Sequence, residues 1–124
     1  MTFKQRPLSP HLQIYKLPLT GLISISHRIT GVLLCLGFPA LLGMLFSISN
    51  GEAAFQSMQA FLTLPLINLL LWAFIYALLF HLCHGVRHLL WDIGLGFQPN
   101  RLQTYALYEI LASLFLTGLV YLLL

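Results

Sequence analysis

Charged residues are scarce in this chain of 124 residues. They make up 7% of it, whereas an ordinary soluble domain carries about 25%. Hydrophobic residues account for 59%, and too little polar surface remains to cover a water-soluble globule. This scarcity excludes a cytosolic enzyme, a disordered tail and a free nucleic-acid-binding module. We therefore interpret the net charge of +3 as a determinant of membrane orientation and expect no nucleic-acid partner.

Cysteine is almost absent as well. Cys35 and Cys83 both lie in apolar runs and form no CxxC motif, so we expect two buried, inert thiols and no disulfide framework. The N-terminal segment also lacks the marks of a cleavable signal or a mitochondrial transit peptide. Its basic residues are followed by prolines rather than by a short apolar core. Residues 1–20 are predicted to form an irregular polar arm on the cytoplasmic side.

Three long apolar runs dominate the rest of the chain. About 20 apolar residues suffice to cross a bilayer, and the runs cover about residues 22–48, 65–92 and 105–124. The sequence therefore predicts an all-α membrane protein with three transmembrane helices in a single membrane-anchor domain, 1–124. Lys4, Arg6, Lys16 and Arg101 fall on one side of this topology, which predicts a cytoplasmic N-terminus.

Ionisable side chains are costly inside a bilayer and are therefore candidates for function. At the start of the first span, four residues recur at helical spacing: Ser24, His27, Arg28 and Gly31. Because a helix advances about 100° per residue, this spacing predicts one helix face. That face lies at the end of the span that we expect on the cytoplasmic side.

A second cluster, on the second span, has the same spacing: His81, His84, Gly85 and His88. His81 precedes Trp91 by ten residues, which puts it about 15 Å from the cytoplasmic end and near the bilayer centre. Both clusters are expected to line one pocket in the cytoplasmic half. Arg87 is predicted to point away from this face. Glu109, one turn into the third span, is interpreted as a structural residue favoured by the helix dipole.

A haem would explain a histidine near the bilayer centre, since haem iron commonly takes a proximal histidine. Gly85 would let a flat macrocycle approach, and Arg28, Arg87 and His88 are candidates to pair with its propionates. A zinc site fits less well, because further cysteine or carboxylate ligands are lacking nearby. His81 and His84 lie on one side of one helix and cannot both be axial ligands. A second ligand would come from another subunit.

Three motifs resemble the cytochrome b subunit of succinate dehydrogenase. They are RPLSPHLQIY at residues 6–15, SISHRITG at 24–31 and HLCHGVRHLLWD at 81–92, and they occur in the order typical of that family. The three-span layout extends the resemblance to essentially the whole chain. It implies a membrane subunit of succinate:quinone oxidoreductase that is not an enzyme alone.

The resemblance also implies specific roles for these residues. The first histidine of HxxxGxRH is the family's haem b ligand, here His81, although His84 occupies a variable position and remains a competing candidate. Ser24 and Arg28 would line the ubiquinone site. The residues expected near the haem propionates are His27, Arg87 and His88.

The resemblance implies three partner subunits: a second small membrane anchor, an iron–sulfur subunit and a flavoprotein. The second anchor would supply the other haem ligand and share the helical bundle. The lack of a transit peptide favours a bacterial inner membrane, and a mitochondrially encoded subunit stays open as the alternative. Three other interpretations stay open. They are a fumarate reductase anchor, a haem-free structural anchor whose histidines only bond between helices, and a small haem- or proton-handling protein unrelated to succinate.

Overall fold

The computed structural model describes residues 16–123, so most of the predicted N-terminal arm and its RPLSPHLQIY motif lie outside the described residues. In chain order the elements are α1 (Leu19–Ser49), α2 (Glu52–Leu62), α3 (Pro65–Asp92), the 3₁₀ turn η1 (Pro99–Arg101) and α4 (Leu102–Leu123). The described part contains no strand. The predicted all-α class is confirmed.

Three of these segments are long and apolar enough to cross a membrane. They are α1, α3 and the continuous stretch from η1 through α4, with 31, 28 and 25 residues. At 1.5 Å per residue α1 is about 46 Å long, which exceeds the roughly 30 Å of a hydrocarbon core. It must therefore tilt or protrude. The prediction of three transmembrane helices is confirmed, and α2 is an additional short helix in the first connection.

Proline and glycine mark the helix boundaries. Pro65 is the first residue of α3, where its missing N–H costs nothing. Gly94 and Gly96 follow the end of α3 with φ angles of +81° and +84°, a conformation that only glycine adopts cheaply. These two glycines allow the chain to turn within a few residues and enter α4.

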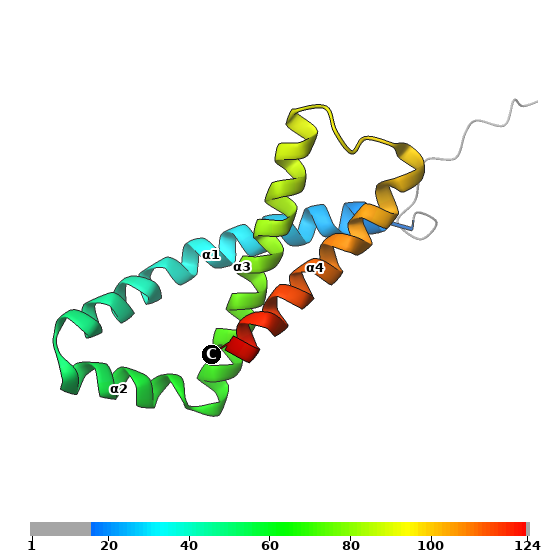
Figure 1. The fold of residues 1–124 in the computed structure, drawn as a ribbon. Coiled ribbons are helices and arrows are strands. Elements are labelled where there is room, and N and C mark those ends of the chain that lie inside the picture. Colours follow the sequence, from blue (N-terminus) through cyan, green and yellow to red (C-terminus); the bar gives the residue numbers. More distant parts are fainter. Residues whose placement is uncertain (1–15, 124) are drawn as a thin grey trace, which may run out of the picture.

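The three long helices meet in one region and diverge from it (Figure 1). The start of α1, the end of α3 and the start of α4 lie toward one end of the molecule, whereas α2 lies at the other. A small core forms where the helices meet, with Ile23, Phe80 and Ala106 at its centre. The site described below is built at this meeting region.

Glycine brings α1 and α3 close together at two positions. A Cβ added to Gly37 would lie 2.1 Å from Cε2 of Phe74, a distance that real contacts do not show. A Cβ added to Gly31 would lie 3.1 Å from Cε1 of His81. The two glycines therefore allow the close approach of α1 and α3.

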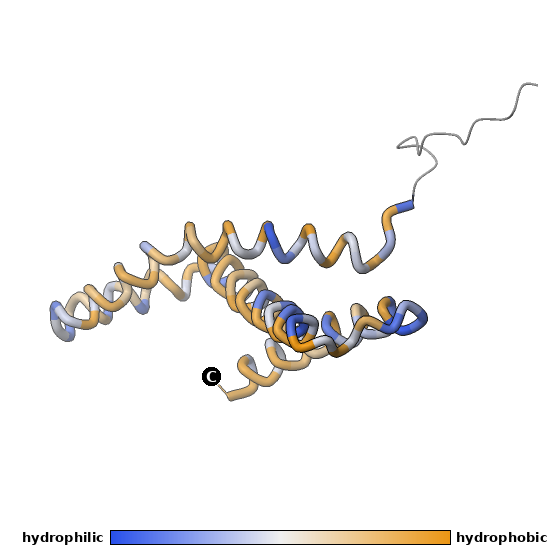
Figure 2. Tube along the Cα trace, turned by 90° about the horizontal axis from the view of Figure 1, so that it is seen from above, coloured by the Kyte–Doolittle hydropathy of each residue, from blue (hydrophilic) through white to orange (hydrophobic). Residues whose placement is uncertain are grey.

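Most apolar side chains outside the core are exposed in this chain. Leu36, Phe46 and Phe115 are examples, and apolar residues run along most of the length of the helices, with polar segments near the loops and at a few places within the helices (Figure 2). These surfaces need lipid or partner helices. The expected burial of both thiols is wrong within this chain, because Cys35 is exposed and Cys83 half-buried.

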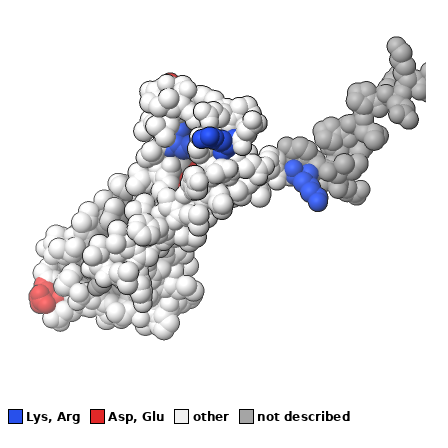
Figure 3. Space-filling model, turned by 45° about the vertical axis from the view of Figure 1, so that its right-hand side comes forward, with Lys and Arg blue, Asp and Glu red and all other residues white. Residues whose placement is uncertain are grey.

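Charge is distributed unequally between the two ends. In the view of Figure 3 the basic side chains gather toward one end, a patch of acidic atoms lies at the opposite end, and smaller acidic areas are visible near the basic side chains. Lys16 precedes α1 and Arg101 precedes α4, whereas Glu52 begins α2. Basic residues thus flank the spans at the end where α1 and α4 start.

Candidate functional site

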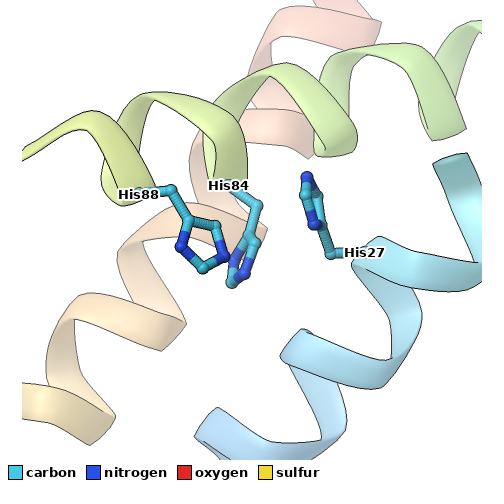
Figure 4. Close-up of side chains that lie close together, drawn as sticks. All are labelled: His27, His84 and His88. Atoms are coloured by element: carbon cyan, nitrogen blue, oxygen red, sulfur yellow. The ribbon is translucent and has the colours of Figure 1, made fainter. Parts of the chain in front are cut away.

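Four histidines from α1 and α3 form one cluster, which we call the histidine cluster: His27, His81, His84 and His88. The ring of His27 stacks on that of His81 with centroids 4.0 Å apart, and it lies 4.4 Å from the ring of His84. Figure 4 shows His27 reaching from α1 toward His84 and His88 on α3. The two polar faces predicted from the sequence thus meet through His27.

The hydrogen bonds of His81 identify which of its nitrogens carries the proton. Nδ1 lies 3.2 Å from Thr30 Oγ1 and 3.2 Å from the backbone oxygen of His27. Thr30 gives its own hydroxyl proton to that same backbone oxygen, at 2.8 Å. Both neighbours of Nδ1 therefore act as acceptors, so Nδ1–H donates to them. Nε2 is left with a free lone pair.

His84 is held from the other side, by α4. Its Nδ1 lies 2.5 Å from Oε1 of Glu109, and Oε2 of Glu109 accepts a hydrogen bond of 3.0 Å from Arg87. Arg87 also donates to the backbone oxygen of Leu102. His84, Arg87 and Glu109 are 1%, 8% and 6% exposed. They form a buried polar network between α3 and α4.

Two histidine nitrogens in the cluster lack partners. Nε2 of His27 and Nε2 of His84 are buried and make no hydrogen bond within the described part of the chain. Buried polar groups are normally satisfied, so such atoms indicate a missing ligand, water or partner. His27, His84 and His88 each offer a ligand atom within 4.8 Å of the others.

The candidate quinone residues differ in their exposure. Arg28 is exposed and Ser24 is half-buried. A hollow of about 230 Å³ at the core is instead lined by Ser26 and Thr30, together with apolar residues of α1, α3 and α4. The structure therefore brings His27 and Gly31 of the first cluster to α3, and leaves Arg28 facing outward.

Glu109 and Thr30 are the two site residues whose contacts the sequence did not reveal. Glu109 was interpreted as a structural residue near a helix start, but it binds both Arg87 and His84. Arg87 reaches toward α4, where it shares Glu109 with His84 of the predicted histidine face. An acidic residue within an apolar span was the available signal. Thr30 lies inside the SISHRITG motif, yet its contact with His81 depends on how the helices cross.

The residues present fit a haem. A metal-bound histidine usually donates its other N–H to a carbonyl or a carboxylate, as Nδ1 of His81 does. Nε2 of His81 is not among the buried unpartnered atoms. One turn further along α3, a Cβ on Gly85 would meet nothing within 4 Å. A flat ligand thus has an accessible nitrogen and an open helix face beside it. His84 offers a similar bonding pattern, but its Nε2 is buried beside His27 and His88.

A second hollow, of about 590 Å³, runs between α3 and α4. Its wall includes Trp91, Tyr105 and Tyr108, as well as Arg87 and Glu109 of the buried network. The guanidinium of Arg87 lies 4.7 Å from the centre of the Trp91 ring, within the range of a cation–π contact. This hollow lies on the side of α3 that faces α4.

Fold and site together define a class: a three-span helical membrane protein with a cluster of four histidines between its first and second spans. The chain belongs to the family described as the succinate dehydrogenase/fumarate reductase transmembrane subunit, whose model matches residues 2–120. The resemblance noted in the sequence is thereby confirmed.

Curated relatives include proteins named succinate dehydrogenase cytochrome b556 subunit. The one from Rickettsia felis is 37% identical over 119 residues, which cover 96% of this chain and 93% of the relative. The one from Paracoccus denitrificans is 39% identical over 93 residues, covering 75% and 72%. The human mitochondrial succinate dehydrogenase cytochrome b560 subunit is 36% identical, covering 92% of this chain and 69% of the relative.

Proposed function

We propose that this chain is the cytochrome b membrane anchor of a bacterial succinate:quinone oxidoreductase. The family assignment and the three spans support an anchor role. In this proposal succinate is oxidised by soluble flavoprotein and iron–sulfur subunits. The chain, with a second small anchor subunit, attaches them to the inner membrane, its N-terminus on the cytoplasmic side.

His81 is the proposed axial ligand of haem b. The observation that carries this assignment is the contact of its Nδ1 with Thr30 Oγ1 and the His27 backbone oxygen, which leaves Nε2 able to bind iron. The open side of Gly85 supports it further. The haem supplies a one-electron acceptor and donor when bound. A further haem ligand would come from the second anchor subunit.

The propionates of that haem are proposed to lie near His27 and His88. The unpartnered, buried Nε2 of His27 is one group that an anionic oxygen could satisfy. His88 is exposed and lies beside it, with ring centroids 5.5 Å apart. Arg87 also belongs to this vicinity, but two of its nitrogens already bond to Glu109 and Leu102. We therefore give His27 and His88 the direct role.

Ser24 and Arg28 are proposed to bind ubiquinone. They are one helical turn apart near the start of α1, and the guanidinium of Arg28 is exposed on the chain alone. A hydroxyl and a guanidinium can both donate to quinone carbonyl oxygens. Arg28 would stabilise the negative charge that develops as the quinone is reduced. Other walls of this site would come from partner subunits.

The proposal is tested by purifying the complex through a tag on this chain in mild detergent. Spectra are recorded as isolated, after succinate and after dithionite. We expect a b-type haem that copurifies with flavoprotein and is at least partly reduced by succinate. His81→Leu should remove the haem band, whereas His84→Leu should retain it.

The other outcomes separate the competing interpretations. A haem reduced only by dithionite, with no flavoprotein, would indicate an unrelated haem protein. A succinate-oxidising complex without haem would leave a structural anchor and refute the ligand assignment. Loss of the band in His84→Leu but not in His81→Leu would transfer the ligand role to His84. A fumarate reductase anchor is the second candidate, since the family description covers both. Fumarate reduction by quinol that outpaces succinate oxidation would favour it.

A further inference from the structure

The assignments above give no role to Glu109, which joins His84 and Arg87 in one buried network. Glu109 lies seven residues into α4, about 10 Å along that helix. Both of its oxygens are used, one by His84 and one by Arg87. A carboxylate at such a depth is costly, and two apolar side chains would join α3 and α4 at least as well. Simple attachment of the helices therefore does not explain this residue.

Both oxygens of Glu109 are satisfied, whereas Nε of Arg87 and Nε2 of His84 have no partner among the described residues. His84 is 1% exposed, yet its Nε2 has no partner among the described residues. The His84 ring lies 4.4 Å from that of His27 and 4.6 Å from that of His88. These are the two residues proposed to meet the haem propionates. The unpartnered nitrogen thus belongs to the part of the site where an anionic ligand would be held.

Charge balance gives the network a function. Without Glu109, the guanidinium of Arg87 would be a buried, uncompensated positive charge next to the histidine cluster. In a low-dielectric interior such a charge acts over longer distances than in water. A positive charge near haem iron stabilises the reduced state relative to the oxidised one. The potential of the haem is therefore sensitive to whether Arg87 is neutralised.

We propose that Glu109 is a positioning residue of the haem pocket, which orients His84 and neutralises Arg87 so that the haem keeps a low reduction potential. This inference rests on the proposed function. Glu109 would touch neither haem nor quinone, and would act only through His84 and Arg87.

The test is a cycle of charge variants in the purified complex, with the haem midpoint potential measured by a mediated redox titration. Glu109→Gln should raise the potential, since Arg87 loses its counter-charge. Arg87→Gln should lower it, since the carboxylate is left unbalanced. The double variant should lie between them, near the wild type. Glu52→Gln is the matched control, because it removes the same charge from exposed α2 and should cause no shift.

The outcomes distinguish a positioning role from a structural one. If Glu109→Gln lowers thermal stability but leaves the potential unchanged, the proposal is overturned. If that variant does not assemble, the difference between Arg87→Gln and the double variant isolates the effect of Glu109. Equal potentials there would overturn the proposal. Absence of haem from the wild-type complex would refute the proposed function instead.

Discussion

At the residue scale, the role of each histidine in the histidine cluster depends on its hydrogen-bond partners, since the residue type alone does not distinguish them. Two histidines one turn apart on α3 are chemically identical, but His81 is held by α1 and His84 by α4. Nε2 of His84 is buried without a partner, and Nε2 of His81 is not. This contrast favours His81 as the ligand.

Thr30→Val is predicted to raise the haem midpoint potential without loss of haem. Thr30 Oγ1 is one of two acceptors for Nδ1–H of His81, and such bonds make a histidine ligand more basic and favour oxidised iron. Removing one acceptor should weaken that effect, while the His27 backbone oxygen keeps the ring in place. The measurement is a redox titration of the purified complex.

Thr63→Val is the matched control for this variant. Thr63 Oγ1 makes the same kind of bond, to a backbone oxygen three residues earlier, but it lies beyond α2 at the other end of the molecule. An equal shift in both variants, or none in Thr30→Val, would show that Thr30 does not tune His81.

Ser24→Ala is predicted to raise the KM for ubiquinone by about tenfold, and Arg28→Leu by about tenfold to a hundredfold, because hydrogen bonds from charged donors contribute more. Electron transfer from succinate to a soluble dye that bypasses the quinone should not change. Ser26→Ala is the control, since Ser26 lines the 230 Å³ hollow and neither Ser24 nor Arg28 does. A quinone KM that responds to Ser26 and not to Ser24 would transfer the site to the inner face of α1.

At the element scale, α1 and α3 pack closely because Gly37 lies under the ring of Phe74. The same packing brings His27 to the histidines of α3, so the geometry of the pocket depends on it. Proline and glycine at the ends of α3 set where this helix begins and where the chain turns into α4. The length of the apolar runs explains why the long helices form. The small residues Gly31 and Gly37 explain how closely α1 and α3 approach each other.

Gly37→Ala is predicted to destabilise the complex by about 1–3 kcal/mol, the usual cost of overpacking a well-packed contact. The added Cβ would lie 2.1 Å from the Phe74 ring, so the ring must turn away or the helices must separate. Thermal loss of the haem band, followed in detergent, measures the effect.

Two further variants test the cause. Gly43→Ala should be neutral, because a Cβ there meets nothing within 4 Å. Phe74→Leu combined with Gly37→Ala should recover part of the lost stability. If Gly37→Ala and Gly43→Ala behave alike, this contact does not set the helix separation.

At the scale of the whole molecule, the chain is an incomplete bundle. Its core is small, and long apolar surfaces on all three spans remain uncovered. The histidine cluster is also uncovered beside Gly85, where an added Cβ would meet nothing within 4 Å. Both features fit a subunit that completes its core and its cofactor site against a partner, with lipid covering the remainder.

The topology is tested by labelling single cysteines with a membrane-impermeant maleimide in a Cys35→Ala, Cys83→Ala background. A cysteine at Asn100, in η1, should react only after the inner membrane is opened. One at Ser57, in α2, should react in intact spheroplasts, because the basic segments at the other end are expected to remain cytoplasmic. The reverse pattern would invert the proposed orientation.

Local properties of the sequence determined the number of spans, their approximate extent and the two polar faces. The length of apolar runs, helical spacing and the placement of Lys and Arg are properties of residues close together in the sequence. They can therefore be recognised without knowing how the helices pack. The HLCHGVRHLLWD motif pointed to the family for the same reason. Ends expected near residues 22 and 105 lie at Leu19 and Leu102, because helix ends depend on capping and packing.

Only the tertiary structure decided which polar groups meet. His27 approaches His81 because α1 crosses α3 at small residues, and Glu109 reaches His84 and Arg87 because α4 packs against the opposite side. Thr30 is half-buried and contacts His81, whereas Arg28 is exposed, and the helical spacing alone does not reveal this difference. Contacts between distant segments depend on helix crossing angles, and these are set by packing across the whole bundle.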